Sequence, residues 1–187
     1  CKQCEVNPVY EFTNKRKLCK NCFTSWFEKK FFYCIKKFNL VSKGDIIGYR
    51  PGNDFRSAVL ERMLKYYGKK APVEIINFEN KEKKANKIAT PESTDSEAES
   101  IVKKLIKEDV DDIGVSSPKI KKADVEIIKP LYLFLDKEIL LYAKIKKIKH
   151  KKPLKKKKKI PKFIDELEEK HPEIKRAIIK GYLELFE

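Results

Sequence analysis

The sequence lacks an uninterrupted apolar run of membrane-spanning length, and it shows no charged-then-apolar leader at its start. We therefore expect a soluble, cytoplasmic protein with no membrane partner. Apolar residues are not scarce: 41% of the 187 residues are hydrophobic, which is enough to build a core although 39% are charged. A chain of this length suits one medium domain, or a small module joined to a small domain.

Acidic residues are absent from residues 144–162, which contain 12 lysines, whereas residues 91–112 hold eight acids against three lysines. The net charge of +16 is therefore concentrated in one block. Such a block indicates that the protein binds a polyanion. The alternative explanation is a solvated lysine-rich loop in a protein from a lysine- and isoleucine-rich proteome. The candidate contact residues are Lys149, Lys151, Lys152, Lys155, Lys156, Lys157, Lys158 and Lys159.

Cysteine is also scarce, but four of the five cysteines form two C-x-x-C pairs, Cys1 with Cys4 and Cys19 with Cys22. Fourteen residues separate the pairs, and they read as a short hairpin that would bring the second pair against the first. Because nothing suggests secretion, we favour a structural zinc ion with four protein ligands over two disulfides. A four-cysteine iron site is the other alternative.

The fifth cysteine, Cys34, belongs to a stripe of apolar residues at helical spacing. The stripe consists of Phe23, Trp26, Phe27, Phe31, Cys34, Ile35 and Phe38. A thiol in this setting is expected to act as a small core residue, and a reactive thiol is the less favoured alternative.

Strands and helices alternate in the middle of the chain. Short apolar runs predict strands at residues 45–50, 72–78 and 86–90, with a helix over residues 54–67 between the first two. Residues 125–134 read as a further extended segment. This alternation favours an α/β fold with a parallel sheet and helices packed on it.

The remaining helices are predicted from their capping residues. Thr94 and Glu97 have the spacing of a capping box ahead of one helix, and Asp136 is expected to cap another over residues 137–148. After Pro161, two short helices are expected to meet at His171 and Pro172. The apolar stripe expected there consists of Ile174, Ala177, Ile178, Tyr182 and Leu185.

The order of these features resembles the PP-loop tRNA-thiolation enzymes, in a degenerate and shortened form. A two-plus-two cysteine knuckle runs into a helix containing Trp26 and Phe27, and a strand, turn and helix follow. Residues 87–110 are similar to the family's K-[IV]-A-T-G-H-N-x-D-D-E-A-Q segment. Residues 127–148 resemble its KP…KE-x-x-x-Y strand and helix, and residues 163–179 its LE-x-x-HP-G-I-K helix pair.

The resemblance implies a zinc ribbon followed by a reduced, HUP/Rossmann-like PP-loop sheet with packed helices. It divides the chain into four parts. These are a zinc-ribbon knuckle at 1–24, a degenerate PP-loop domain with its linking helix at 25–149, a lysine-rich mobile loop at 150–162 and a helical pair at 163–187.

The chain departs from the family in the loop that binds the ATP phosphates. Where the family has S-G-G-K-D-S, this sequence has Arg50, Pro51, Gly52, Asn53, Asp54 and Phe55. Pro51 removes an amide donor, Asn53 replaces a cation and Phe55 replaces a hydroxyl, so several converging donors of an anion cradle are missing. Asp54 matches the family, but it is also a good N-cap for the next helix.

The cysteine count adds to these departures. Between residues 78 and 86 the family has further structure carrying cysteines, whereas this chain has a short charged segment. With four cysteines assigned to the N-terminal site, one is left, which cannot supply the three thiolates of a cluster. We therefore expect neither ATP nor an iron–sulfur cluster as a cofactor, and we do not expect an enzyme.

Three hypotheses about the function follow. The favoured hypothesis is a catalytically inactive paralogue that acts as a subunit or tRNA-binding partner of an active PP-loop tRNA 2-thiolation enzyme, with RNA contacts through the lysine block. The alternative is a zinc-ribbon RNA-binding accessory protein of ribosomal or other RNA assemblies. A third reading, a rewired nucleotide pocket at Asn53 and Asp54, would require tight ATP binding.

Overall fold

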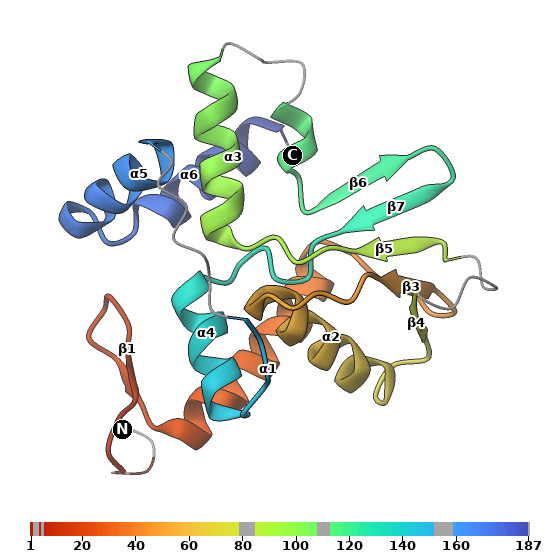
Figure 1. The fold of residues 1–187 in the computed structure, drawn as a ribbon, viewed down its shortest axis with the longest axis horizontal. Coiled ribbons are helices and arrows are strands. Elements are labelled where there is room, and N and C mark those ends of the chain that lie inside the picture. Colours follow the sequence, from red (N-terminus) through yellow and green to blue (C-terminus); the bar gives the residue numbers. More distant parts are fainter. Residues whose placement is uncertain (2–3, 5, 79–84, 108–112, 152–158, 187) are drawn as a thin grey trace.

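The computed structural model describes residues 1, 4, 6–78, 85–107, 113–151 and 159–186 (Figure 1). The described chain begins with a small antiparallel hairpin of β1 (Tyr10–Glu11) and β2 (Lys17–Leu18), as expected from the spacing of the cysteines. The hairpin leads directly into α1 (Lys20–Lys37). This helix crosses residue 24, where the sequence suggested a domain boundary, so the knuckle and the following domain share a continuous helix.

Five strands form one sheet in the order β4–β3–β5–β7–β6. Their bounds are Ile46–Tyr49 for β3, Glu74–Asn77 for β4, Lys87–Ala89 for β5, Lys119–Lys122 for β6 and Val125–Ile128 for β7. The first four strands in that order are parallel, which confirms the predicted α/β class and the three strands predicted before residue 91.

The sequence reading was wrong at one edge of the sheet. Strand β6 was not predicted, because four lysine-rich residues carry no strand pattern; it pairs antiparallel with β7. Its lysines suit an edge, where charge prevents pairing with another chain. The extended segment predicted at 125–134 is a strand only to Ile128, and the chain then turns at Pro130, which has no amide to continue the ladder.

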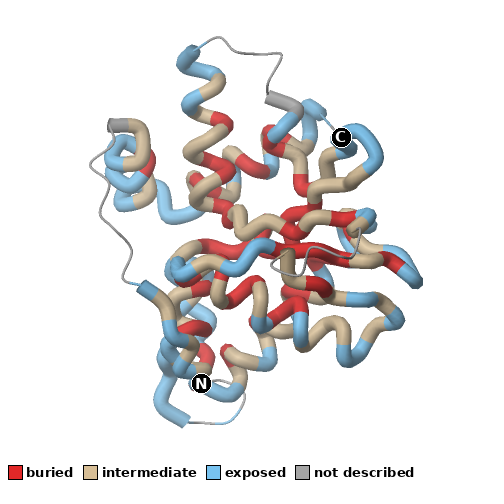
Figure 2. The backbone as a smooth tube through the Cα atoms, turned by 45° about the vertical axis from the view of Figure 1, so that its right-hand side comes forward, coloured by how far each residue is buried: buried red, intermediate tan, exposed pale blue. Residues whose placement is uncertain are grey.

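The helices form two groups on opposite sides of the sheet (Figures 1 and 2). One group contains α1, α2 (Phe55–Gly68) and α4 (Asp136–Ile145), and the other contains α3 (Thr94–Ile106), α5 (Lys159–Lys170) and α6 (Ile174–Phe186), with a short 3₁₀ turn at Ile113–Ser116. Figure 2 shows the buried residues concentrated where the strands meet the helices. Within the described residues, none of these helices has both the length and the apolar character needed to cross a membrane.

The aromatic stripe of α1 forms the centre of one of these layers, as predicted. Phe23, Phe27 and Phe31 are completely buried, and the ring of Phe27 stacks on Tyr142 of α4 with the ring centres 4.1 Å apart. Cys34 is also completely buried, and burial raises the pKa of its thiol to about 12. This confirms Cys34 as a core residue, because a protonated, enclosed thiol is a poor nucleophile.

Two predicted helix caps are each displaced by one residue. Helix α3 is capped by Ser93, whose hydroxyl accepts the amide of Ser96, while the hydroxyl of Thr94 donates to the backbone of Tyr132. Helix α4 starts at Asp136 itself, and the amide before it, on Leu135, donates to Glu138. In both cases a tertiary contact holds the residue that local spacing had assigned as the cap.

The C-terminal helices meet at His171 as predicted, but α5 begins at Lys159, before Pro161 rather than after it. The stripe predicted on α6 is partly wrong. Ile179 and Tyr182 are buried, whereas Ala177 is exposed and Leu185 is 80% exposed. The face that packs on α3 is therefore rotated from the predicted one. The four-part domain division stays a prediction.

Glu138 joins four parts of the chain through one completely buried carboxylate. It accepts hydrogen bonds from Lys30 of α1 at 2.8 Å, from Tyr10 of the hairpin at 3.1 Å and from Arg176 of α6 at 2.9 Å, as well as from the amide of Leu135. Burial lowers the pKa of Lys30, and the carboxylate opposes this effect. A buried charge is tolerated only when it is paired and hydrogen-bonded, and Glu138 meets this condition.

We predict that Glu138→Gln lowers the free energy of unfolding by about 3 kcal/mol, because it leaves two partly buried cations without their counter-charge. Urea denaturation followed by circular dichroism measures this change. The control Glu166→Gln alters a pair whose carboxylate is 59% exposed and should shift stability by less than about 0.5 kcal/mol. Equal effects of the two substitutions would contradict the role of Glu138.

Candidate functional site

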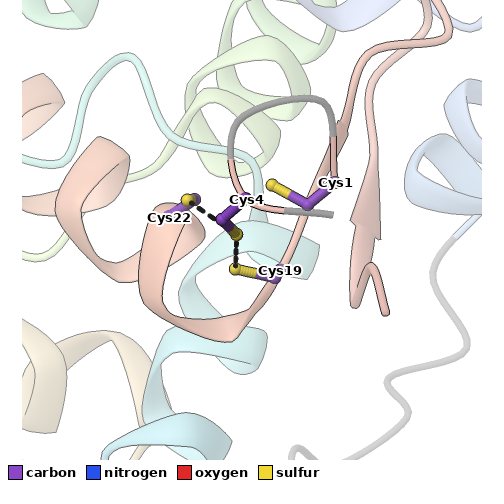
Figure 3. A group of neighbouring side chains, drawn as sticks. All are labelled: Cys1, Cys4, Cys19 and Cys22. Carbon is purple, nitrogen blue, oxygen red and sulfur yellow. Dashed lines mark hydrogen bonds between the residues drawn. The ribbon is translucent and has the colours of Figure 1, made fainter. Parts of the chain in front are cut away.

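The four N-terminal cysteines come together at the start of α1 (Figure 3). Cys1 and Cys4 lie in the segment before β1, Cys19 is the N-cap residue of α1 and Cys22 lies in its first turn. All four sulfur atoms are within 4.8 Å of one another, with 3.2 Å from Cys4 to Cys19 and 3.7 Å from Cys4 to Cys22. The structure therefore brings the predicted ligand set into one cluster.

These distances fit four thiolates around one ion. A Zn–S bond of about 2.3 Å places tetrahedral ligands about 3.8 Å apart. The amide of Cys22 at the start of α1, together with Cys4, lowers the pKa of Cys19 to about 7, whereas Cys19, burial and Cys4 raise the pKa of Cys22 to about 11. Cys19 therefore gives up its proton more readily than Cys22 to form the thiolate that a metal requires. The cluster is thus able to bind a metal, and with four protein ligands it leaves no open position for catalysis.

The cluster is attached to the body of the protein through the hairpin. The ring of Tyr10 packs on Phe23 with the ring centres 5.1 Å apart, and the Tyr10 hydroxyl reaches Glu138. The hydroxyl of Thr13 donates to Glu173 next to α6. The metal site therefore has a fixed position relative to the α/β domain.

The second candidate site is the loop after β3, which lies at the carboxyl edge of the sheet. Strands β4 and β5 flank β3 on either side, so the strand order reverses there, and this is where open α/β sheets bind ligands. Asp54 caps α2 as predicted: its side chain accepts hydrogen bonds from the amides of Arg56 at 3.0 Å and Ser57 at 3.2 Å. A carboxylate thus already occupies the start of this helix.

The other loop residues lie as follows. Phe55 is buried, while Arg50, Pro51 and Asn53 are exposed. Gly52 packs closely on α2, because a Cβ at this position would lie 2.6 Å from the hydroxyl oxygen of Ser57. The loop is compact and is held by its own polar groups.

A chain of charges behind this loop was not found from the sequence. Arg56 of α2 donates to Asp136 of α4, and the amide of Asp136 donates to Asp95 of α3 at 2.7 Å. Lys175 of α6 donates to Asp95 at 2.7 Å and to Asp165 of α5 at 2.8 Å. No spacing pattern in the sequence predicts this chain of charges, because each of its contacts joins different helices.

The pKa values of the residues in this chain of charges depend on burial and on the neighbouring charges. Burial and then the charge of Asp136 raise the pKa of Asp95, while Lys175 opposes them. Burial by itself would lower the pKa of Lys175, but its carboxylate neighbours outweigh that effect and raise it. The chain of charges therefore fixes α5 and α6 against the carboxyl edge of the sheet.

Part of the predicted polyanion contact lies beside this loop. Lys149 and Lys151 are exposed, and the amide of Lys151 donates to the carbonyl of Asn53 at 2.6 Å. Lys149 also lines a groove of about 690 Å³ between α1, α2 and α4, whose other cationic residues are Arg62, Lys65, Lys69 and Lys146. Lys152 and Lys155–Lys158 lie outside the described residues, as does the side chain of Lys159.

We predict that the purified chain carries one equivalent of zinc and that Cys19→Ser lowers it to well under half, because the loss of one thiolate opens the tetrahedral site. Elemental analysis by mass spectrometry measures both values. Cys34→Ala serves as the control and should keep the full equivalent, since Cys34 lies in the core. Iron and sulfide in place of zinc would contradict the assignment.

No family model and no curated protein matches this chain. Among solved structures, it is similar to the U34-tRNA thiolase NcsA from Methanococcus maripaludis with its [4Fe-4S] cluster. The two share 18% sequence identity, and the match covers 100% of this chain and 86% of the thiolase chain with a TM-score of 0.80. This chain thus has the PP-loop-like α/β fold of a tRNA thiolase, as the resemblance implied.

Proposed function

We propose that this protein is a non-catalytic, tRNA-binding partner of an active tRNA 2-thiolation enzyme, built on the same fold. The observation that carries the proposal is the state of the loop after β3. The amides of Arg56 and Ser57 and the hydroxyl of Ser57 all donate to Asp54. Because the resemblance places an aspartate at this position too, the cap by itself does not exclude a phosphate. The loop differs instead at Pro51, which has no amide to donate, and at Asn53 and Phe55.

The neighbouring positions support the same conclusion. Phe55 stands where the resemblance places a phosphate-facing hydroxyl, and its side chain packs into the core instead. Asn53 stands in place of a cation, and its carbonyl is tied to Lys151. Phosphoryl chemistry depends on converging donors and cations, so these changes together argue against ATP-dependent activity.

A tRNA-binding role is supported by the groove beside this loop. Five cationic residues and two acids, Glu28 and Glu61, line it. Lys146 pairs with Glu28 and Lys65 with Glu61, while Lys69 and Lys149 make no ion pair within the described part of the chain. An excess of lysine around a groove neutralises phosphates with little sequence preference, which suits a partner that holds RNA.

The spacing of the four cysteines supports a single metal ion rather than a cluster, and the thiolate-only ligand set is typical of structural zinc. Their sulfur atoms lie no more than 4.8 Å apart, which matches ligands that share a single ion. A cluster places several iron atoms between its thiolates and requires a wider set. We therefore propose a structural zinc site, with an iron–sulfur cluster expected neither here nor at Cys34.

We predict that ATP with magnesium binds with a Kd weaker than about 1 mM, corresponding to less than about 4 kcal/mol of binding free energy. Isothermal titration calorimetry on the metal-loaded chain tests this value. Asp54→Asn removes the negative charge but keeps a cap, so a gain in ATP affinity for that variant would show that the carboxylate excludes phosphate. A Kd in the micromolar range for the unmodified chain would instead favour the rewired nucleotide pocket.

We predict salt-dependent binding of a tRNA transcript. The double variant Lys69→Ala and Lys149→Ala should reduce the slope of log K against log salt by about 1.5, because each phosphate contact contributes about 0.7–0.9. Fluorescence anisotropy at several salt concentrations measures the slope. The matched control, Lys170→Ala with Lys180→Ala on α5 and α6, should leave it unchanged.

Competition in the same assay separates the two RNA hypotheses. Preference for tRNA over a ribosomal RNA fragment of equal length supports the thiolation partner. Preference for the ribosomal fragment supports the accessory protein of RNA assemblies, and no RNA binding at low salt contradicts both.

A further inference from the structure

The outward face of α1 forms a second groove, separate from the one between α1, α2 and α4. It has a volume of about 570 Å³ and runs from the hairpin along α1, with Arg16, Cys22, Trp26, Lys29 and Tyr33 among its lining residues. Within the described residues, none of its lining side chains is acidic. The groove is therefore lined by cationic, polar and aromatic side chains, and it begins beside the cysteine cluster.

Only some of the cationic side chains in this groove form ion pairs within the protein. Lys30 is held by Glu138 and has a structural role. Lys29 is exposed and has no ion-pair partner in the described part of the chain, and the guanidinium of Arg16 lies 4.4 Å from the ring centre of Phe12. Arg16 and Lys29 can thus contact an anion without breaking an ion pair of the fold.

Tyr33 supplies an aromatic surface at the far end of the groove. Its side chain is 56% exposed, whereas the preceding Phe32 turns inward to Tyr67, with the ring centres 5.3 Å apart. The ammonium of Lys37 lies 6.0 Å from the Tyr33 ring centre. An exposed ring between cations matches what single-stranded nucleic acids require, namely a stacking surface for a base and charges for the flanking phosphates.

Further cations lie past Tyr33. At the end of α1, Lys37 lines a smaller groove of about 440 Å³ together with Lys119 and Lys121 of β6. Glu126 of β7 also lines this groove and pairs with Lys119 at 3.1 Å, which leaves Lys37 and Lys121 as its unpaired cations among the described residues. From Cys22 to Lys37 the helix rises about 22 Å, at 1.5 Å per residue. This length accommodates several nucleotides in extended form.

We propose that the surface from Arg16 of the hairpin along the outward face of α1 to Lys37 binds an unpaired stretch of nucleic acid with one base stacked on Tyr33. Under the proposed function, on which this inference rests, the ligand is an unpaired segment of tRNA. A duplex does not fit, because its base faces are covered by their neighbours and cannot reach the ring. The groove between α1, α2 and α4 would contact phosphates only, so the two surfaces have different roles.

The test uses the full metal-loaded chain with two probes, an unstructured single-stranded RNA and a blunt RNA duplex of the same length. We predict that Tyr33→Ala weakens binding of the single strand about tenfold and changes duplex binding less than twofold, since stacking is lost and the charges stay. Tyr33→Phe should restore single-strand affinity because it keeps the ring. Phe163→Ala, which removes a ring that is 52% exposed on α5, is the matched control and should have no effect.

A spectroscopic signal locates the ligand. Trp26 is the only tryptophan in the chain and lines the groove, so single-stranded RNA should quench its fluorescence while the duplex should not. Thermal melts of each variant exclude unfolding as the cause of weaker binding.

The outcomes distinguish a failure of this inference from a failure of the proposed function. If the unmodified chain binds tRNA but Tyr33→Ala leaves single-strand affinity unchanged, this inference is overturned and the proposed function stands. Equal weakening of single strand and duplex, or displacement of the RNA by an acidic peptide at equal charge concentration, would show charge recognition without stacking and would also overturn it. If no RNA binds, the proposed function fails and the inference fails with it.

Discussion

The structure depends on one buried carboxylate. Glu138 lies at the start of α4 and receives Tyr10 from the hairpin, Lys30 from α1 and Arg176 from α6. A carboxylate removed from water must find several donors, and two of these donors, Tyr10 and Lys30, lie more than 100 residues from Glu138 in the sequence. The requirement to satisfy this charge therefore holds the cysteine cluster, the central helix and the C-terminal helices in one arrangement.

Helix α1 serves three purposes through three of its faces. Its first turn supplies two cysteines of the cluster, its inner face carries the aromatic core with Phe27 stacked on Tyr142, and its outer face exposes Lys29 and Tyr33. Because a helix is stiff, the metal site fixes the position of the groove that begins beside it. Under the proposed function, a structural metal would thus affect RNA binding without contacting RNA.

The loop after β3 joins a central strand of the sheet to a well-capped helix. Its helix keeps a good cap in Asp54, and the strand before it stays in the centre of the sheet. Arg56, Asp136, Asp95 and Lys175 then connect the elements around the loop through charged contacts. These charged contacts stabilise this edge of the sheet.

The sequence by itself determined whatever depends on local spacing: the two C-x-x-C turns, the hairpin between them, the three parallel strands before residue 91, the Asp54 cap and the aromatic face of α1. Only the tertiary structure decided the lysine-rich edge strand β6, the shifted starts of α3 and α4, the buried face of α6 and the contacts of Glu138 and Asp95. The reason is physical. A cap or a periodic face is set by neighbours a few residues away, whereas a buried charge is satisfied by donors that only the folded chain brings together.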